Sequence, residues 1–226
     1  MRSTWISGCL LLLFAVTAFG ADLTSEQVRD ALARATPDHP ADFAGKSLEK
    51  LDLSKFNFTG ARLAGANLFG AKLVEADFTG ADLSGATLDL AWVIRTNFTR
   101  ANLTHASLQG LVVSMGMETS AAQAPILPGA DLSGARIVAR LSWANMQGAR
   151  FVDARMGADM KNQSMGLTRA DLSSANLAKA DLSGADLTGA NLTGADVSGA
   201  NFKQTVLTGA RGLDRMKGEP LNAPPY

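Results

Sequence analysis

The stretch that decides the fold is ADFTGADLSG, residues 76–85, which holds two copies of one five-residue pattern. A small residue comes first, a polar residue second and a large apolar residue third, and the fourth and fifth positions carry residues typical of turns. Outward from this stretch, every fifth residue from Phe43 to Val113 is apolar. The pattern breaks at 114–128 and returns over 129–211, where two units are one residue short.

A period of five fits neither the 3.6 residues of an α-helical turn nor the two-residue alternation of a plain strand. A three-residue strand, however, points its first and third side chains the same way, and two further residues can turn a corner. The chain is therefore predicted to wind into a coil with a dry interior of Ala, Leu and Phe. Phe58, Phe78 and Phe98 recur at every fourth unit, so four units per coil would stack their rings in one column.

The A(D/N)LxG pattern resembles the pentapeptide-repeat family over about residues 41–211. The resemblance implies an all-β fold, a right-handed quadrilateral β-helix, with a first block at 41–113, a loop excursion at 114–128 and a second block at 129–211. It also implies a role in binding or scaffolding, since members are mostly not enzymes, and homodimerisation through the C-terminal coil.

Both ends of such a rod need covers, because a terminal coil exposes apolar side chains and unpaired backbone groups. Residues 21–40 are expected to form an N-terminal helical cap, in which Thr24 or Ser25 begins the helix and Val28, Ala31 and Leu32 lie on its apolar side. Residues 212–226 are interpreted as a short cover followed by a loose C-terminal tail.

Residues 1–20 have the layout of a secretory signal peptide. Arg2 precedes an uncharged, mostly apolar run, and Ala18 and Gly20 are the small residues of a cleavage site. That run is short for a membrane span, although an uncleaved anchor is the alternative. We therefore expect cleavage after Gly20, a periplasmic or secreted protein, and no membrane span after signal cleavage. Because Cys9 is the one cysteine, the processed chain would contain no disulfide.

Charge limits the choice of partners. The 226 residues contain 21 Lys and Arg against 21 Asp and Glu, so a nucleic-acid partner is not expected. Some family members act as DNA mimics that inhibit or protect type II topoisomerases through a strongly acidic surface. That function is the alternative to scaffolding, and the neutral charge and the export signal both disfavour it.

Residues that carry chemistry are few. His39 and His105 are the two histidines, and neither lies in a catalytic or metal-ligand spacing. The Asp residues mostly fill the polar second position, so their pairing is no sign of acid–base catalysis. Met115 and Met117 offer thioethers, but the methionines elsewhere fill core positions. The sequence thus predicts no enzyme, no cofactor and no metal site.

One column of the predicted coil departs from the pattern. Trp92 and Val112 take second positions that should be polar, Val74 and Ile94 lie at fourth positions of the same column, and Arg95 follows at the corner. These five residues would form an exposed apolar patch, and such patches mark partner surfaces. The alternative is that the 114–128 excursion folds back and covers them.

Trp143 breaks a second rule, because it occupies a corner position usually held by Gly or a polar residue. It lies between the two short units, where the coil must be distorted. Both a bend of the rod and a functional irregularity fit this position. On sequence alone, the chain is predicted to be an exported scaffold or protein-binding module with an unknown partner in the cell envelope.

Overall fold

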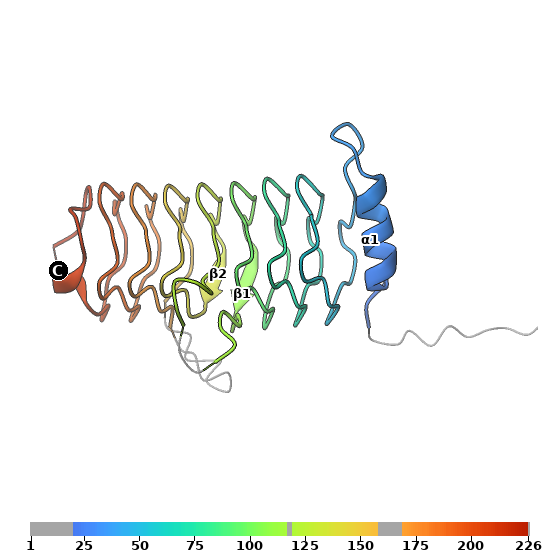
Figure 1. Cartoon of the computed structure of the whole chain (residues 1–226). Helices are drawn as coiled ribbons and strands as arrows, with labels where there is room; N and C mark the ends of the chain where they lie inside the picture. The colour runs from blue at the N-terminus through green and yellow to red at the C-terminus, as the bar shows by residue number, and fades with distance from the viewer. Residues whose placement is uncertain (1–19, 117–118, 158–168, 226) are drawn as a thin grey trace, which may run out of the picture.

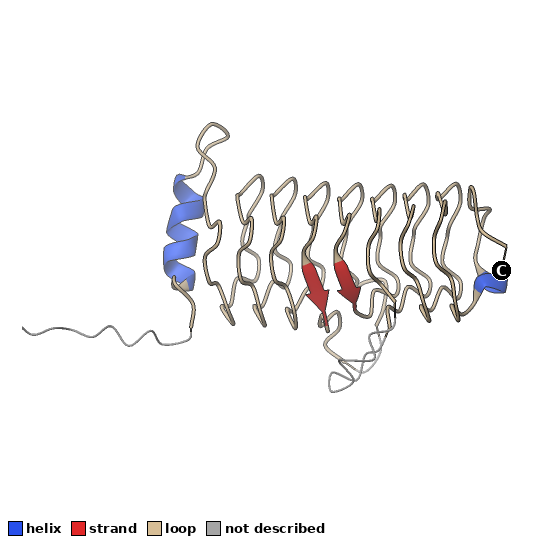
Figure 2. Ribbon diagram, turned by 180° about the vertical axis from the view of Figure 1, so that it is seen from behind, coloured by secondary structure: helices blue, strands red, loops and turns tan. Residues whose placement is uncertain are grey.

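The computed structural model describes residues 20–116, 119–157 and 169–225. Residues 1–19, most of the predicted signal peptide, and Met117 therefore lie outside the described residues. Helix α1 (Ser25–Arg34) stands at one end of a long rod, and the short 3-10 helix η2 (Leu213–Arg215) lies near the other (Figure 1). Two short strands, β1 (Ser107–Gln109) and β2 (Arg136–Val138), pair in the middle of the rod (Figure 2).

The rod is a β-helix built from parallel pairings between successive coils. In its first part each pairing joins residues 20 apart, and a coil contributes four of them: Asp42 to Arg62, Ser47 to Asn67, Asp52 to Lys72, and Asn57 to Asp77. We name each column of paired residues after its first residue and call it a face of the rod. The predicted β-helix of stacked coils is confirmed, although among the described residues three-residue strands occur only at β1 and β2 and the other pairings are single bridges.

The interior is as the period of five predicts. The third-position Leu and Phe side chains of the first block are buried, as are the first-position alanines from Ala61 onward. The rings of Phe58 and Phe78 stack at 4.6 Å and those of Phe78 and Phe98 at 5.3 Å. Second-position side chains point outward, and their carboxylate or amide oxygens commonly accept the fourth-position N–H, as Asp77 does from Thr79.

Helix α1 covers the N-terminal end of the rod. Thr24 is its N-cap and forms a capping box with Gln27, which supplies two hydrogen bonds to otherwise unpaired N–H groups. Val28 is fully buried, and Ala31 and Leu32 pack against the core of the first coil. The predicted helical cap is therefore present.

The coil resumes earlier than the sequence indicates. Ile126 already pairs with Asn97 and Asn145, and Leu127 is buried as a third-position residue. The segment that leaves the rod therefore ends before Ile126 and not at Pro128. Beyond it, the short unit at 135–138 lacks the usual corner, and its strand β2 pairs with β1 over three consecutive residues.

The register of the second block also corrects the unit count. The period suggests core positions at Met160 and Leu167, but both lie outside the described residues. Asp171 pairs with Arg140, and Asp186 with Arg155, so Met156 and Leu172 belong to successive faces of one coil. The described pairings therefore place no other face of the coil between these two residues.

The C-terminal residues are not merely a tail. Lys217 pairs with Asp196 and Leu221 with Asn201, so the coil continues well past the predicted end at 211. The N–H groups of Lys217 and Leu221 donate to Ala195 and Ala200 at 2.8 and 2.7 Å. This last partial coil covers the apolar end of the rod.

Candidate binding surface

The predicted patch lies on the Asp52 face, where Lys72, Trp92 and Val112 pair in consecutive coils. Trp92 is 36% exposed and Val112 is half-buried, so an indole and an isopropyl group lie next to each other at the surface. Parallel pairing holds their Cα atoms about 4.8 Å apart. The structure thus brings together two of the five predicted residues as expected.

Ile94 is not part of the exposed surface, because it is only 2% exposed. The neighbouring Arg95 N–H donates to the carbonyl of Gln123 at 3.0 Å, and Ala124 and Pro125 are buried. The returning arm of the excursion thus runs beside Ile94. The prediction that Ile94 is exposed is wrong, and the cover suggested as the alternative is present over this part of the column.

Val74 and Arg95 form the border of the surface. Val74 is half-buried. The Arg95 guanidinium pairs with Glu75 one coil below, and Glu75 also lies 3.8 Å from the Lys55 ammonium group. Three charged corners of alternating sign therefore stack along the edge of the Asp52 face. Arg95 contributes a fixed, exposed cation beside Trp92.

Two exposed apolar residues extend the surface beyond the predicted set. Met115 is 72% exposed and lies shortly after Val112, where the chain leaves the coil. Trp143 is 50% exposed at the corner that ends the Asp52 face in the following coil. We call Trp92, Val112, Met115 and Trp143 together the Trp92–Trp143 surface.

The excursion is attached to both sides of this surface. On one side, the Arg95 N–H donates to the Gln123 carbonyl, whereas corner N–H groups elsewhere donate to a carbonyl of the next coil. On the other side, the Thr119 hydroxyl forms a hydrogen bond with the buried Ser142 hydroxyl next to Trp143. The coils of Trp92 and Trp143 have one coil between them, which corresponds to about 10 Å along the rod. The sequence identifies Trp143 as an exception to the repeat pattern. It does not predict that Trp143 lies near Trp92, because it does not show which residues pair across the excursion.

Charged residues occupy both ends of the same face. Arg140 continues it past Val112 and is exposed. At the other end, hydrogen bonds from the Ser54 hydroxyl and N–H hold the pKa of Asp52 below its usual value, and Lys72 acts in the same direction. The Lys72 ammonium group lies 3.9 Å from the Asp52 carboxylate. The apolar side chains are thus bordered by charged groups.

Chemistry elsewhere on the rod is sparse. Among the described residues, no three His, Cys, Asp or Glu side chains group so as to hold a metal ion. His39 belongs to the turn that follows α1, where its N–H donates to the Thr36 carbonyl. The His105 imidazole lies over Gly134 of the next coil. Within the same described ranges, no helix is long and apolar enough to cross a membrane.

Comparison with known proteins agrees with this architecture. The family model "Pentapeptide repeats" matches eight copies, within residues 47–85, 81–112 and 167–211. HetL from the cyanobacterium Nostoc, a pentapeptide repeat protein involved in heterocyst differentiation regulation, is 35% identical; the match covers 77% of each chain, with a TM-score of 0.29. A pentapeptide repeat protein from the thylakoid lumen of Arabidopsis thaliana is 30% identical over 50% of this chain and 66% of that one, with a TM-score of 0.30.

More distant similarity extends to QnrB1, a plasmid-mediated fluoroquinolone resistance protein, at 20% identity over 80% of this chain and 84% of that one, with a TM-score of 0.45. Comparison with curated proteins gave no match. The stacked five-residue units define a β-helical repeat protein. Together with the matched family model and the identity to HetL, they show that the chain belongs to the pentapeptide-repeat family.

Proposed function

We propose that this protein is an exported, non-enzymatic scaffold or protein-binding module that holds a protein partner on the Trp92–Trp143 surface. One observation carries the proposal: two partly exposed tryptophans lie close to Val112 and Met115 on a rod whose other second positions are mostly polar. The proposed rod is the right-handed quadrilateral form of the family's β-helix.

Physical chemistry supports a protein as the partner. Trp and Arg are enriched among the residues that dominate binding energy, and exposed Trp92 and Trp143 are flanked by Arg95 and Arg140. The backbone beneath them is fixed by hydrogen bonds on both sides: the Trp92 N–H donates to Ala71 of the coil before at 2.9 Å, and the Val112 N–H of the coil after donates to Ala91 at 2.9 Å. A rigid surface loses little conformational entropy on binding, which favours affinity.

Export is the second part of the proposal and rests on the segment at 1–20. It places the partner in the cell envelope or outside the cell, and it leaves a processed chain without cysteine. The protein isolated after secretion should begin at Ala21, which N-terminal sequencing or intact mass would show. A protein that keeps the segment 1–20 and stays in the cytoplasm would contradict this part.

The binding experiment compares matched surface substitutions. A photo-crosslinking amino acid at Val112 should give a discrete adduct in the envelope fraction, and Trp92→Asp together with Trp143→Asp should abolish it. Ile126→Asp is the control, because Ile126 is 40% exposed at a second position of the neighbouring face. Equal loss with the control, or no adduct with the unmodified surface, would refute the proposed site.

No observation on the described residues favours the topoisomerase alternative. Acidic second positions alternate with cations along the columns, as where Arg62 lies 3.9 Å from Asp42 and Arg150 lies 3.5 Å from Asp131. Homodimerisation through the C-terminal coil remains part of the proposal, supported by Leu221, which is 55% exposed there. Sedimentation of the protein with and without Leu221→Asp tests it.

A further inference from the structure

The N-terminal end of the rod has an open backbone edge on the Asn57 face. In the next coil, the Asp77 N–H donates to Phe56 at 2.9 Å, and its carbonyl accepts from Phe58 at 2.7 Å. The equivalent groups of Asn57 would face the end of the rod, and no described residue donates to its carbonyl or accepts from its N–H. Asn57 is also less enclosed than the residues stacked after it, since it begins the column.

The chain itself shows how such an edge is closed. On the Ser47 face, the Asp22 N–H donates to the Ser47 carbonyl at 2.7 Å, and the Asp22 carboxylate accepts from the Ser47 N–H at 2.8 Å. The residue shortly before α1 therefore takes the place of a missing coil on that face. On the Asn57 face, α1 stands away from the edge and leaves a groove.

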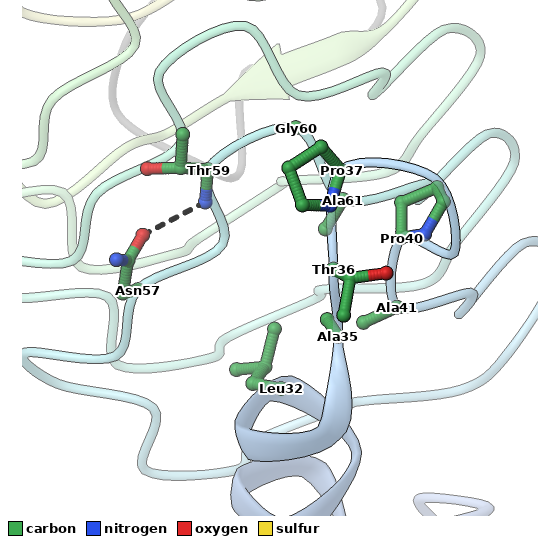
Figure 3. A pocket seen from close by; sticks show the side chains of 10 residues that line it. All are labelled: Leu32, Ala35, Thr36, Pro37, Pro40, Ala41, Asn57, Thr59, Gly60 and Ala61. Carbon is green, nitrogen blue, oxygen red and sulfur yellow. Dashed lines mark hydrogen bonds between the residues drawn. The ribbon is translucent and has the colours of Figure 1, made fainter.

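Two cavities make up this groove and meet at Asn57. One, of about 460 Å³, is lined by Leu32, Pro37, Pro40 and Ala61 among others, and Figure 3 shows the Asn57–Thr59 hydrogen bond to one side of these side chains. The other, of about 390 Å³, is lined by Arg29, Ala33, Lys55 and Phe56, and shares Leu32 and Asn57 with the first. Each is in the size range of sites that hold small ligands.

The two halves of the groove differ in charge. The Arg29 guanidinium lies over the Phe56 ring at 5.1 Å, and no acidic side chain of the described residues forms an ion pair with it. Lys55 stands beside it at the rod corner, where its ammonium group lies 3.8 Å from the Glu75 carboxylate. The half beyond Asn57 is lined mostly by alkyl and proline side chains, with Thr36 and Thr59 among them. One end thus favours a carboxylate and the other favours small apolar groups.

We propose that this groove binds an extended, acidic peptide segment of a partner protein, which adds to the Asn57 edge as a parallel strand. Its backbone pairs with the free N–H and carbonyl of Asn57, the mode known as strand addition. Every pairing among the described residues of the rod is parallel, so the acidic residue lies on the N-terminal side, near Arg29 and Lys55. Small apolar residues follow it into the Leu32 half.

The test uses the acetylated, amidated hexapeptide Glu-Glu-Thr-Ala-Val-Ala with the full chain, read out by amide hydrogen exchange. The peptide should slow exchange of the Asn57 amide tenfold or more and leave Asp52 unchanged, since the Asp52 edge is open but lies outside the cavities. The same peptide with Lys in place of Glu should bind about fivefold or more weakly, and Arg29→Glu should reverse that preference.

Asn57→Pro is the second variant, since it removes an N–H that has no partner among the described residues. It should abolish binding while the melting temperature stays within a few degrees. Unchanged Asn57 exchange at millimolar peptide, or equal protection of Asp52, overturns the proposal. The proposal is also overturned if the Asn57 amide is protected without peptide. If removal of the segment 1–20 abolishes that protection, the occupant is this chain itself, and if dilution abolishes it, the occupant is a second copy. The groove contains no residue of the Trp92–Trp143 surface, so a negative result in this test would not contradict the proposed function.

Discussion

The closure of the C-terminal end places Gly212 at a position that accepts no side chain. Gly212 has φ +72°, and a Cβ atom added to it would lie 2.5 Å from the Thr193 Cα and 2.6 Å from the Thr193 N. These are backbone atoms of the coil beneath, so they cannot rotate away. Gly80 is the matched control, because it has φ +63° and an added Cβ would meet nothing within 4 Å.

Both substitutions by alanine place an L-residue in the left-handed region, which costs about 1 kcal/mol. Gly212→Ala adds an overpacking cost of about 2 kcal/mol, so its total is about 3 kcal/mol. The backbone around residues 212–225 is attached by few hydrogen bonds, such as those from Lys217 and Leu221. We therefore expect this segment to detach locally before the rod unfolds.

Limited trypsin digestion measures that detachment, because Arg215 and Lys217 lie within the segment. This total of about 3 kcal/mol corresponds to roughly 150-fold faster cleavage there when opening is rapid. Gly80→Ala should leave the C-terminal cleavage rate unchanged. Equal rates for the two variants would refute the argument that contact with Thr193 fixes this end of the rod.

Three other experiments test the core, the surface carboxylates and the alternative function. Leu83→Ala should lower the free energy of unfolding by about 2–5 kcal/mol, because the side chain is fully buried. Asp82→Ala should lower it by about 1 kcal/mol, because Asp82 accepts hydrogen bonds from Ser84 and Asn102. Urea titrations of the two variants measure the difference. Partial burial raises the pKa of Asp181, but hydrogen bonds, chiefly from Ser183, outweigh it and leave the pKa below its usual value. Its stabilisation is present above about pH 4 and is lost as the pH falls below that, so Asp181→Asn should flatten the fall in melting temperature on acidification. Gyrase supercoiling should be unchanged by added protein, and inhibition at micromolar concentration would instead favour the topoisomerase alternative.

The regular part of the rod could be predicted from sequence because one geometric rule repeats. A side chain buried at every fifth position fixes which residues face inward, and the recurrence of Phe58, Phe78 and Phe98 at every fourth unit sets the length of a coil. The stacked rings and the pairings between equivalent positions of successive coils follow from that rule. No long-range information was needed.

The excursion shows where the rule fails. Residues 125–129, PILPG, form a repeat unit that carries none of the usual Ala or Asp, so the sequence predicts a loop there. In the structure Pro125 and Leu127 are buried as first and third positions. Ile126 offers no side-chain oxygen at the second position, and Pro128 has no N–H at the fourth. In most units the fourth-position N–H donates to the second-position side chain. This unit lacks both the donor and the acceptor, so neither group is left without its usual partner.

The exposed surface was only partly predictable for a different reason. Ile94 is buried next to the returning arm of the excursion. That arm follows it in sequence only after a complete further coil and a loop, and no local period encodes the contact. Trp143 joins the surface because the excursion and the short unit at 135–138 together set the register of the coil that follows. Periodicity gives the position of a residue on a face, but not what an inserted segment covers.

Irregularity is also what allows such a rod to be specific. Repeated coils present nearly the same polar rows at each level, so a partner that read only those rows would bind in several registers, each shifted by about 4.8 Å. The Trp92–Trp143 surface exists at one level, where the excursion leaves the coil and Arg95 and Arg140 flank the apolar side chains. Moving a bound partner by one coil would leave an indole unburied and change the charged neighbours it meets. If the two tryptophans fix the position of the partner along the rod, a single substitution at Trp92 or Trp143 should reduce affinity. It should also let the partner shift by a coil, so that crosslinks form at neighbouring coils.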